Sequence, residues 1–310
     1  MIATVTLNAS VDKLYLVESL NPYEVSRVKK VNNTAGGKGM NVSRIISQAG
    51  EDVAAAGIIG GYNGMLFESL ITQINIAKCF TRIEGETRCC VNLWDLSAQK
   101  STEYLEPGFT VTSEDLERFV EDYIRVVKIC GAVCISGSTP PGTPDDFCAR
   151  LVSIAGELGK PVLVDVAGVQ LKEAIKARPT VIKPNKDEIE QLFPIDSSSF
   201  GQLAQTAQSL RQSGIEIAAI SVGKEGAVVA CGQGVFYAKP PAVDVVNTVG
   251  SGDSMIAGFA IGICRKYSVI ETIRYAVALA TANTLTMETG SFKKQDLESL
   301  LPKIQIEKMD

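Results

Sequence analysis

Residues 246–254 place a carboxylate directly behind a glycine-rich turn. They read Val-Asn-Thr-Val-Gly-Ser-Gly-Asp-Ser, and residues 255–264 follow as an apolar run typical of a helix. The start of a helix presents unpaired N–H groups and a partial positive charge, which favour an anion such as phosphate. A carboxylate cannot hold phosphate, so Asp253 is expected to take a proton from a hydroxyl that attacks the phosphate. The alternative is an ordinary helix N-terminus, where Asp253 favours the helix dipole.

The absence of histidine narrows the chemistry further. With no histidine among 310 residues, the chain has no Ser-His-Asp or Cys-His catalysis and lacks most zinc sites. The hydrophobic content of 45% is enough for a large core. A net charge of −5 and a pI near 5.1 argue against nucleic acid or an anionic membrane as the main partner. Small molecules are therefore the expected ligands.

The sequence also predicts a cytoplasmic protein. It has no apolar run of eighteen residues, and residues 1–7 are typical of a first strand rather than of a signal peptide. None of the eight cysteines forms a C-x-x-C pair, and most lie in apolar segments. We expect these thiols to be reduced.

Segments typical of strands alternate with segments typical of helices, as in an α/β fold with a largely parallel sheet. We interpret the chain as one domain, residues 1–310, because no convincing linker divides it. The expected strands are residues 4–7, 53–59, 132–135, 162–166, 181–182, 218–222 and 227–230, and the expected helices are residues 39–48, 66–73, 145–158, 171–177, 202–212, 253–265 and 270–286.

Two segments interrupt this alternation, residues 13–34 and 88–106. Both are interpreted as extended strands that form a small lid sheet beside the main one. The apolar face of such a lid would stay exposed unless it met a partner. This favours a homodimer.

A second glycine-rich turn covers residues 35–41, which read Ala-Gly-Gly-Lys-Gly-Met-Asn. A double glycine with a cation before an amphipathic helix predicts an anion or polyol site. The four-residue spacer and the Lys-Ser/Thr ending of a Walker A loop are missing. The alternative is a tight strand-to-helix turn with a solvated Lys38.

Other polar residues follow expected strands, whose carboxyl ends should face one crevice. Asp12 is a candidate for holding sugar hydroxyls, or else a turn-stabilising residue. Asn185 and Glu188 share one helix face and could hold hydrated magnesium, although such a pair is also a common capping arrangement. Arg88 in the lid could clamp a substrate phosphate. Residues 136–142 add a polar loop and residues 221–226 a tight turn.

Three of these motifs occur together in a family. Gly-Gly-Lys-Gly-Met-Asn at 36–41, Lys-Pro-Asn-x-x-Glu at 183–188 and Thr-Val-Gly-Ser-Gly-Asp-Ser at 248–254 closely resemble, in order and spacing, the signature regions of the PfkB sugar kinases. The resemblance covers essentially the whole chain. It implies a ribokinase-like fold with a mostly parallel central sheet, flanking helices and a small β-sheet lid, which often pairs between subunits.

The resemblance also implies roles for individual residues. Asp253 would be the general base, while the backbone N–H groups of Gly250, Ser251 and Gly252 would stabilise the charge on the transferring phosphoryl group. The sugar phosphate would contact Asp12, Gly37, Lys38, Gly39, Asn41, Arg88 and Ser138, with Arg27 reaching in from the neighbouring subunit's lid. The nucleotide side would comprise Lys183, Asn185, Ser221, Gly223, Gly226 and Asn283, with Glu188 acting on Mg²⁺ through water.

Residues 4–8, 35–39 and 85–88 resemble the hexose-phosphate branch of this family. The expected function is phosphorylation of a ketohexose monophosphate by ATP, with Mg²⁺ and with a monovalent cation as a candidate support for the loop before Asp253. Residues 85–88 and 102–106 favour tagatose-6-phosphate kinase, while residues 254–258 fit 1-phosphofructokinase. Ala9-Ser10 and Thr139 depart from the usual pattern and bear on substrate choice. A catalytically silent sugar-phosphate sensor is a further alternative.

Overall fold

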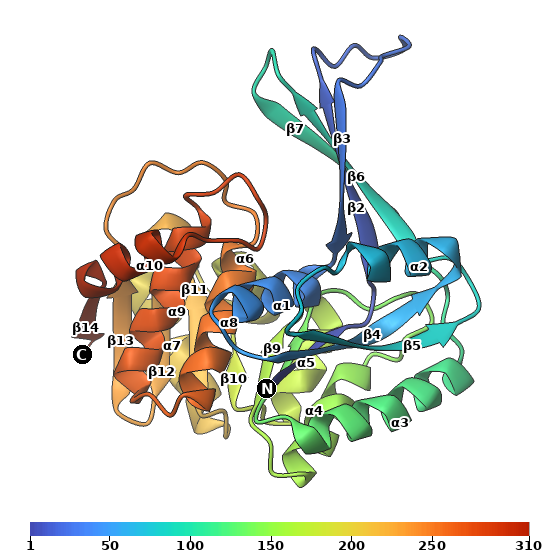
Figure 1. Ribbon diagram of the computed structural model, residues 1–310. Helices are drawn as coiled ribbons and strands as arrows, with labels where there is room; N and C mark the ends of the chain where they lie inside the picture. Colours follow the sequence, from blue (N-terminus) through green and yellow to red (C-terminus); the bar gives the residue numbers. More distant parts are fainter. Residues whose placement is uncertain (310) are drawn as a thin grey trace.

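The computed structural model describes residues 1–309, which form a ten-stranded central sheet and a four-stranded lid (Figure 1). The central sheet has the order β14-β13-β12-β11-β10-β9-β8-β1-β4-β5. Its strands are β1 Ile2–Thr6, β4 Val53–Gly60, β5 Ile76–Ile83, β8 Val133–Ser136, β9 Val162–Asp165, β10 Val181–Ile182, β11 Ile217–Ser221, β12 Ala227–Cys231, β13 Gly234–Lys239 and β14 Gln305–Met309.

In the central sheet, β5, β4, β1, β8, β9, β10 and β11 run parallel to one another. The remaining strands, β12, β13 and β14, continue the sheet in antiparallel pairs. Parallel strands are covered on both faces, so they read as continuous apolar runs. In β1, Ile2 packs into one core cluster, while Ala3 and Val5 pack into the other. Because these strands are parallel, their carboxyl ends lie on the same side of the sheet, and the polar residues that follow them lie there too.

Helices cover both faces of the central sheet. One face carries α1 Lys38–Gln48, α2 Gly61–Leu70, α8 Ser251–Cys264, α9 Val269–Asn283 and α10 Lys294–Leu300. The other carries α3 Ser113–Ile129, α4 Phe147–Glu157, α5 Gly168–Lys176, α6 Lys186–Leu192 and α7 Phe200–Gln212. This layered arrangement confirms the expected α/β fold with a mostly parallel sheet.

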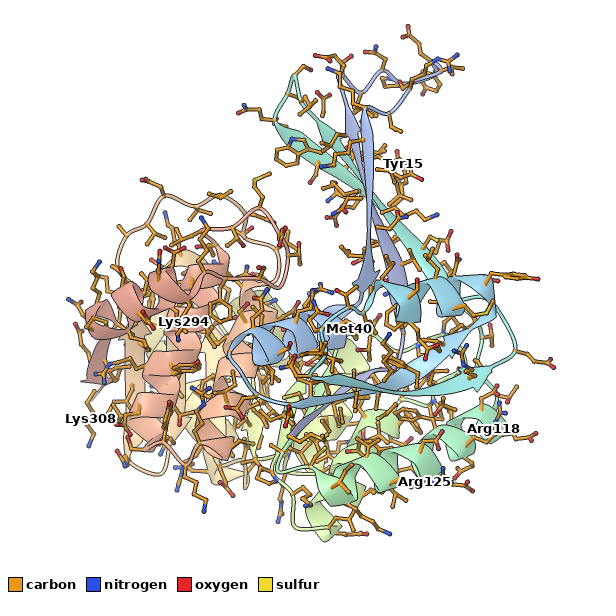
Figure 2. All side chains as sticks on the ribbon, in the orientation of Figure 1. Tyr15, Met40, Arg118, Arg125, Lys294 and Lys308 are labelled. Atoms are coloured by element: carbon orange, nitrogen blue, oxygen red, sulfur yellow. The ribbon has the colours of Figure 1, made fainter. Side chains whose placement is uncertain are left out.

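The lid stands away from the central sheet (Figure 1). It has the order β3-β2-β6-β7, built from β2 Ser10–Val17, β3 Lys30–Gly36, β6 Arg88–Asp95 and β7 Lys100–Leu105. Figure 2 shows Tyr15 on the lid and Met40, in α1, near its base. These strands fall largely within the two segments expected for the lid, and residues 18–29 between β2 and β3 form a loop instead of a strand.

One expected helix lies at a shifted position, and several elements of the structure were not expected from the sequence. The helix expected at residues 66–73 is α2, Gly61–Leu70, which ends because Ile71 is extended, with φ −84° and ψ 98°. β5, α3, β13, β14 and α10 were not predicted. All eight cysteines are unpaired. In the described residues, no helix has the length and hydropathy that crossing a membrane requires.

The packing of α8 against α9 depends on Gly258. A Cβ at this position would lie 2.4 Å from the Ala276 Cα, so the two helix backbones would have to separate. We expect Gly258→Ala to lower the free energy of unfolding by about 1–3 kcal/mol, the usual cost of overpacking. Urea denaturation measures this change.

Gly156→Ala is the matched control, because Gly156 lies in α4 and a Cβ there would meet nothing within 4 Å. Helix propensity predicts that it stabilises the protein by up to about 1 kcal/mol. Equal unfolding midpoints for the two variants would contradict the close approach of α8 and α9.

Candidate active site

Gly250 shapes the turn that opens α8. It has φ 84°, in the left-handed region, and a Cβ there would lie 2.8 Å from the Gly290 backbone nitrogen. The Ser251 N–H donates to the Thr248 carbonyl at 3.3 Å, whereas the N–H groups of Gly252 and Asp253 have no bond within residues 1–309. Two free donors at a helix start form an anion site. Of the three N–H groups expected to stabilise the transferring phosphoryl group, those of Gly250, Ser251 and Gly252, only the Ser251 N–H has a backbone partner within residues 1–309.

Asp253 lies in the first turn of α8 and is buried. The side-chain amide of Asn41, in α1, donates to its Oδ2 at 2.7 Å. Burial, together with the nearby charge of Asp165, raises the pKa of Asp253 to about 6, while the Asn41 bond and two lysines oppose this shift. A carboxylate with this pKa is largely ionised at neutral pH and is a stronger base than an exposed one.

Two lysines converge on the carboxylate of Asp165, which ends β9. Its Oδ1 lies 3.3 Å from the Lys183 Nζ and 3.7 Å from the Lys38 Nζ. Lys183 is buried, and its Nζ lies 3.3 Å from the place of a Cβ on Gly252. The charge of Asp165 raises the pKa of Lys38 and outweighs the burial of Lys38, which lowers it. Both ammonium groups therefore lie close to the turn before Asp253.

The first lid strand carries Asp12 to the same place. Its carboxylate lies over Gly36, where a Cβ would clash with it, and its Oδ1 accepts a 2.6 Å bond from Ser10. Burial is the main cause that raises the pKa of Asp12. The start of α1 also lies close to β1. Gly37 has φ 97°, and a Cβ on Gly39 would lie 2.5 Å from the Val5 carbonyl oxygen.

Arg88 lies at the base of the lid. Its guanidinium donates to the carbonyl oxygens of Asn8 at 3.1 Å and Glu106 at 2.9 Å. The Asn8 amide lies 3.5 Å from the Ser138 hydroxyl, so Arg88 and Ser138 are joined through Asn8. Arg88 also lines a cavity of about 440 Å³. The structure thus brings the two expected phosphate contacts into one region.

The residues expected on the nucleotide side follow β10 and β11. Asn185 and Glu188 form a capping box, in which the Asn185 Oδ1 accepts from the Glu188 N–H at 2.8 Å and the Glu188 Oε2 from the Asn185 N–H at 2.9 Å. Ser221 pairs with Asn185 through a β-bridge. Gly223 and Gly226 have φ 61° and 99° around the following turn.

Asn283 is fully buried beneath the turn before α8. Its side-chain amide donates to the Val249 carbonyl at 2.9 Å, and its oxygen accepts from the Ser291 N–H at 3.3 Å. These bonds hold two loops together. In this structure Asn283 thus connects the turn before α8 to the loop at Ser291, and its expected place on the nucleotide side stays a prediction.

The donor set around Glu188 fits magnesium as a hydrated ion. Within residues 1–309, no group of three or more acidic, cysteine or histidine side chains could hold a metal ion. The capping box uses Glu188 Oε2 and leaves Oε1 available. Because Mg²⁺ usually keeps several waters, one carboxylate with a free oxygen is sufficient to bind it through water.

Arg27 lies outside this site in its own chain. It belongs to the exposed loop at the far end of the lid (Figure 1). The sequence did not single out Asp165, which pairs with both lysines, or Arg44, whose guanidinium donates to the side-chain oxygen of Asn41. Asp165 falls within a segment that was interpreted only as a strand, although its position at the carboxyl end was a usable signal. Arg44 belongs to an amphipathic helix, in which a single arginine is typical of the solvent-facing side and does not indicate a site.

A carboxylate behind a glycine turn, two nearby ammonium groups and a lid are the parts of a phosphoryl-transfer site. The model of the pfkB family carbohydrate kinases matches residues 3–296. The chain belongs to this family. As a pfkB kinase it transfers phosphate to a hydroxyl of a sugar substrate.

Solved structures of other proteins agree with this assignment. Phosphofructokinase-2 from Escherichia coli, in complex with potassium, is 26% identical with a TM-score of 0.92, over 97% of this chain and 98% of that one. A possible 1-phosphofructokinase from Thermotoga maritima is 26% identical with a TM-score of 0.89, over 100% of both chains. Arabidopsis thaliana ribokinase, 21% identical with a TM-score of 0.75 over 97% and 98%, shares the ribokinase-like fold. These neighbours include phosphofructokinases, which agrees with membership of a family of carbohydrate kinases.

The raised pKa of Asp253 predicts an acid limb in the pH profile. The protonated carboxyl cannot accept the hydroxyl proton, so kcat should fall about tenfold per pH unit below about 6 and should level off above pH 7. Phosphate esters also titrate near pH 6. The measurement is therefore kcat at saturating substrates, with the residual activity of Asp253→Asn as the control. A limb that stays in this variant would assign it to another group.

Proposed function

We propose that this protein is an ATP-dependent kinase of a ketohexose monophosphate, which it converts to a bisphosphate. The observation that carries the proposal is the buried Asp253 carboxylate, which follows the glycine turn at Gly250. Its Oδ2 accepts a 2.7 Å hydrogen bond from the Asn41 side-chain amide. This arrangement provides a base beside an anion site. A sensor without catalysis would not need an ionised carboxylate kept buried at this cost.

In the proposed reaction, Asp253 takes the proton of the sugar hydroxyl. The hydroxyl oxygen forms a bond to the γ-phosphorus of ATP, and the bond to the bridging oxygen breaks to release ADP. The N–H groups of Gly252 and Asp253 and the ammonium groups of Lys38 and Lys183 would balance the charge on the transferring group. Magnesium, held through water by Glu188, would neutralise charge on the nucleotide phosphates.

The charges around the sugar side favour a substrate that already carries phosphate. Arg88 presents a guanidinium at the base of the lid, and Asn8 connects it to Ser138. Asp12 suits sugar hydroxyls, since a carboxylate accepts from them and would repel phosphate. The sugar is therefore expected to bind with its hydroxyls near Asp12 and its existing phosphate near Arg88.

Tagatose 6-phosphate is our first candidate substrate, because residues 85–88 and 102–106 resemble those of tagatose-6-phosphate kinases. Fructose 1-phosphate is the second, supported by residues 254–258 and by the Thermotoga maritima neighbour. Escherichia coli phosphofructokinase-2 was itself solved with fructose 6-phosphate. All three sugars belong in one comparison.

The test is ADP formation by the purified protein with tagatose 6-phosphate, fructose 1-phosphate and fructose 6-phosphate. We expect the highest kcat/KM with tagatose 6-phosphate. Asp253→Asn should lower kcat by at least about 100-fold, the usual size of general-base catalysis. No ADP with any of the three sugars would reject the proposed function. A variant that retains more than about a hundredth of wild-type turnover would reject the assigned base.

We further propose that the protein forms a homodimer through its lid. Several large apolar side chains of the lid are exposed, including Val31, Tyr104 and Leu105. Such a surface is expected to meet a partner. Escherichia coli phosphofructokinase-2 has been solved in a tetrameric form.

We also propose that a monovalent cation supports the loop before Asp253. Escherichia coli phosphofructokinase-2 has been solved in complex with potassium. Replacing potassium with tetramethylammonium in the assay tests this proposal.

In such a dimer, Arg27 would contact the sugar phosphate bound to the partner. Arg27→Ala should then raise the KM for the sugar phosphate about tenfold, as for loss of one charge-assisted hydrogen bond, and leave the KM for ATP unchanged. Lys29→Ala is the matched control, because Lys29 lies in the same loop but pairs with Glu18. Sedimentation velocity reports the oligomeric state. A monomeric enzyme, or equal effects of the two variants, would contradict this role.

A further inference from the structure

Arg44 joins three separate segments around the active site. Its Nη1 donates to the Ala35 carbonyl at 2.5 Å, at the end of the lid strand β3. Its Nη2 donates to the side-chain oxygen of Asn41 in α1, and also to the Thr289 carbonyl at 3.4 Å. Within residues 1–309 these bonds all end on neutral oxygens, and Arg44 makes no ion pair. A half-buried guanidinium without a counterion requires an explanation.

The explanation lies in the amide of Asn41. An amide can turn by 180°, which exchanges its oxygen and its NH₂ group. A guanidinium has only donors, so the amide oxygen must face Arg44 and the NH₂ group must face Asp253. This is the observed orientation, in which the Asn41 Nδ2 donates to the Asp253 Oδ2 at 2.7 Å. Arg44 therefore fixes the same orientation of the amide that the ionised Asp253 carboxylate requires.

The charge of Arg44 acts in the same direction. Burial lowers the pKa of Arg44, and the carboxylates of Asp12, Asp253 and Glu288 oppose this shift. The charge of the guanidinium is thus felt by both the carboxylate expected to hold sugar hydroxyls and the carboxylate expected to act as base. A cation there favours the ionised form of both groups.

We propose that Arg44 is a positioning residue for catalysis, which fixes the Asn41 amide so that its NH₂ group holds Asp253 in place to accept the sugar proton. This inference rests on the proposed role of Asp253. It goes beyond that role, because Arg44 contacts neither the nucleotide nor the transferring phosphate in the proposed reaction. Its effect should pass through Asn41.

A purely structural role is the rival explanation, since Arg44 also ties α1 to β3. Arg265 provides a matched control for it. Its guanidinium donates to the Ala49 carbonyl, at the C-terminal end of the same helix, at 2.8 Å, and to Glu51 at 2.7 Å. Arg265→Ala should lower the melting temperature and leave kcat within about twofold of wild type, as for a surface anchor far from a site.

The test is a double-mutant cycle on kcat with Arg44→Ala, Asn41→Ala and the double variant. We expect Arg44→Ala to lower kcat about 10- to 100-fold, as for a misplaced catalytic group, with little change in the KM for ATP. In the Asn41→Ala background, Arg44→Ala should cost less than about threefold, because its target is gone. Equal losses of kcat in both backgrounds, or kcat within twofold of wild type, would overturn the proposal.

Arg44→Lys keeps the test valid should Arg44→Ala not fold. A lysine keeps the charge but lacks the planar fork that reaches Ala35 and Asn41 together. We expect a melting temperature near that of wild type and kcat lowered about tenfold, as for a partly misplaced base. Wild-type kcat in this variant would overturn the proposal.

A readout without turnover separates this inference from the proposed function. In ¹³C NMR titrations of the Asp253 carboxyl carbon, with Asp253→Asn for assignment, Arg44→Ala should raise the midpoint by about one pH unit, because the amide is free to turn its oxygen toward the carboxylate. Asp165, Lys38 and Lys183 also face Asp253 and are unchanged in this comparison. An unchanged midpoint would overturn the positioning role, even in a protein that phosphorylates none of the tested sugars.

Discussion

The site depends on keeping the Asp253 carboxylate ionised while it is buried. Removing a carboxylate from water is costly unless hydrogen bonds and nearby charges replace the water. Here the replacement comes from the Asn41 amide, from Lys38 and Lys183, and from the start of α8. These groups belong to distant parts of the sequence. Lys183 follows the parallel strand β10, whereas Lys38 and Asn41 belong to α1 and Asp253 to α8, two helices on one face of the central sheet.

Asp165 balances this arrangement. A single buried carboxylate contacts two ammonium groups, and it holds both of them near the turn before α8. The same carboxylate raises the pKa of Asp253 through charge repulsion. One residue thus orders the lysines that attract phosphate and makes the base stronger. Such arrangements commonly lower stability in exchange for activity.

Much of the central fold was predictable, because buried parallel strands read as continuous apolar runs and glycine-rich turns mark where ligands approach. The missed elements have specific reasons. β5 is an edge strand whose Lys78 and Arg82 interrupt its apolar pattern. By contrast, α3 has a strong signal that was overlooked, since Thr112 and Asp115 form a capping box.

The side-chain network was less predictable than the backbone. The motif at residues 36–41 indicated a ligand site, but no spacing rule could show that Arg44 orients Asn41. The shared contact of Lys38 and Lys183 with Asp165 also crosses the expected division between sugar and nucleotide sides. Such contacts depend on where three elements meet in space. Sequence periodicity describes only one element at a time.

The most direct measurement is the midpoint of the Asp253 carboxyl titration in the wild-type protein without ligands, followed by ¹³C NMR. A buried carboxylate held by one amide and two lysines should titrate near pH 6. A midpoint at or below the ordinary value of about 3.9 for aspartate would contradict this description of the site, because Asp253 would then be a weak base in a solvated or strongly paired environment.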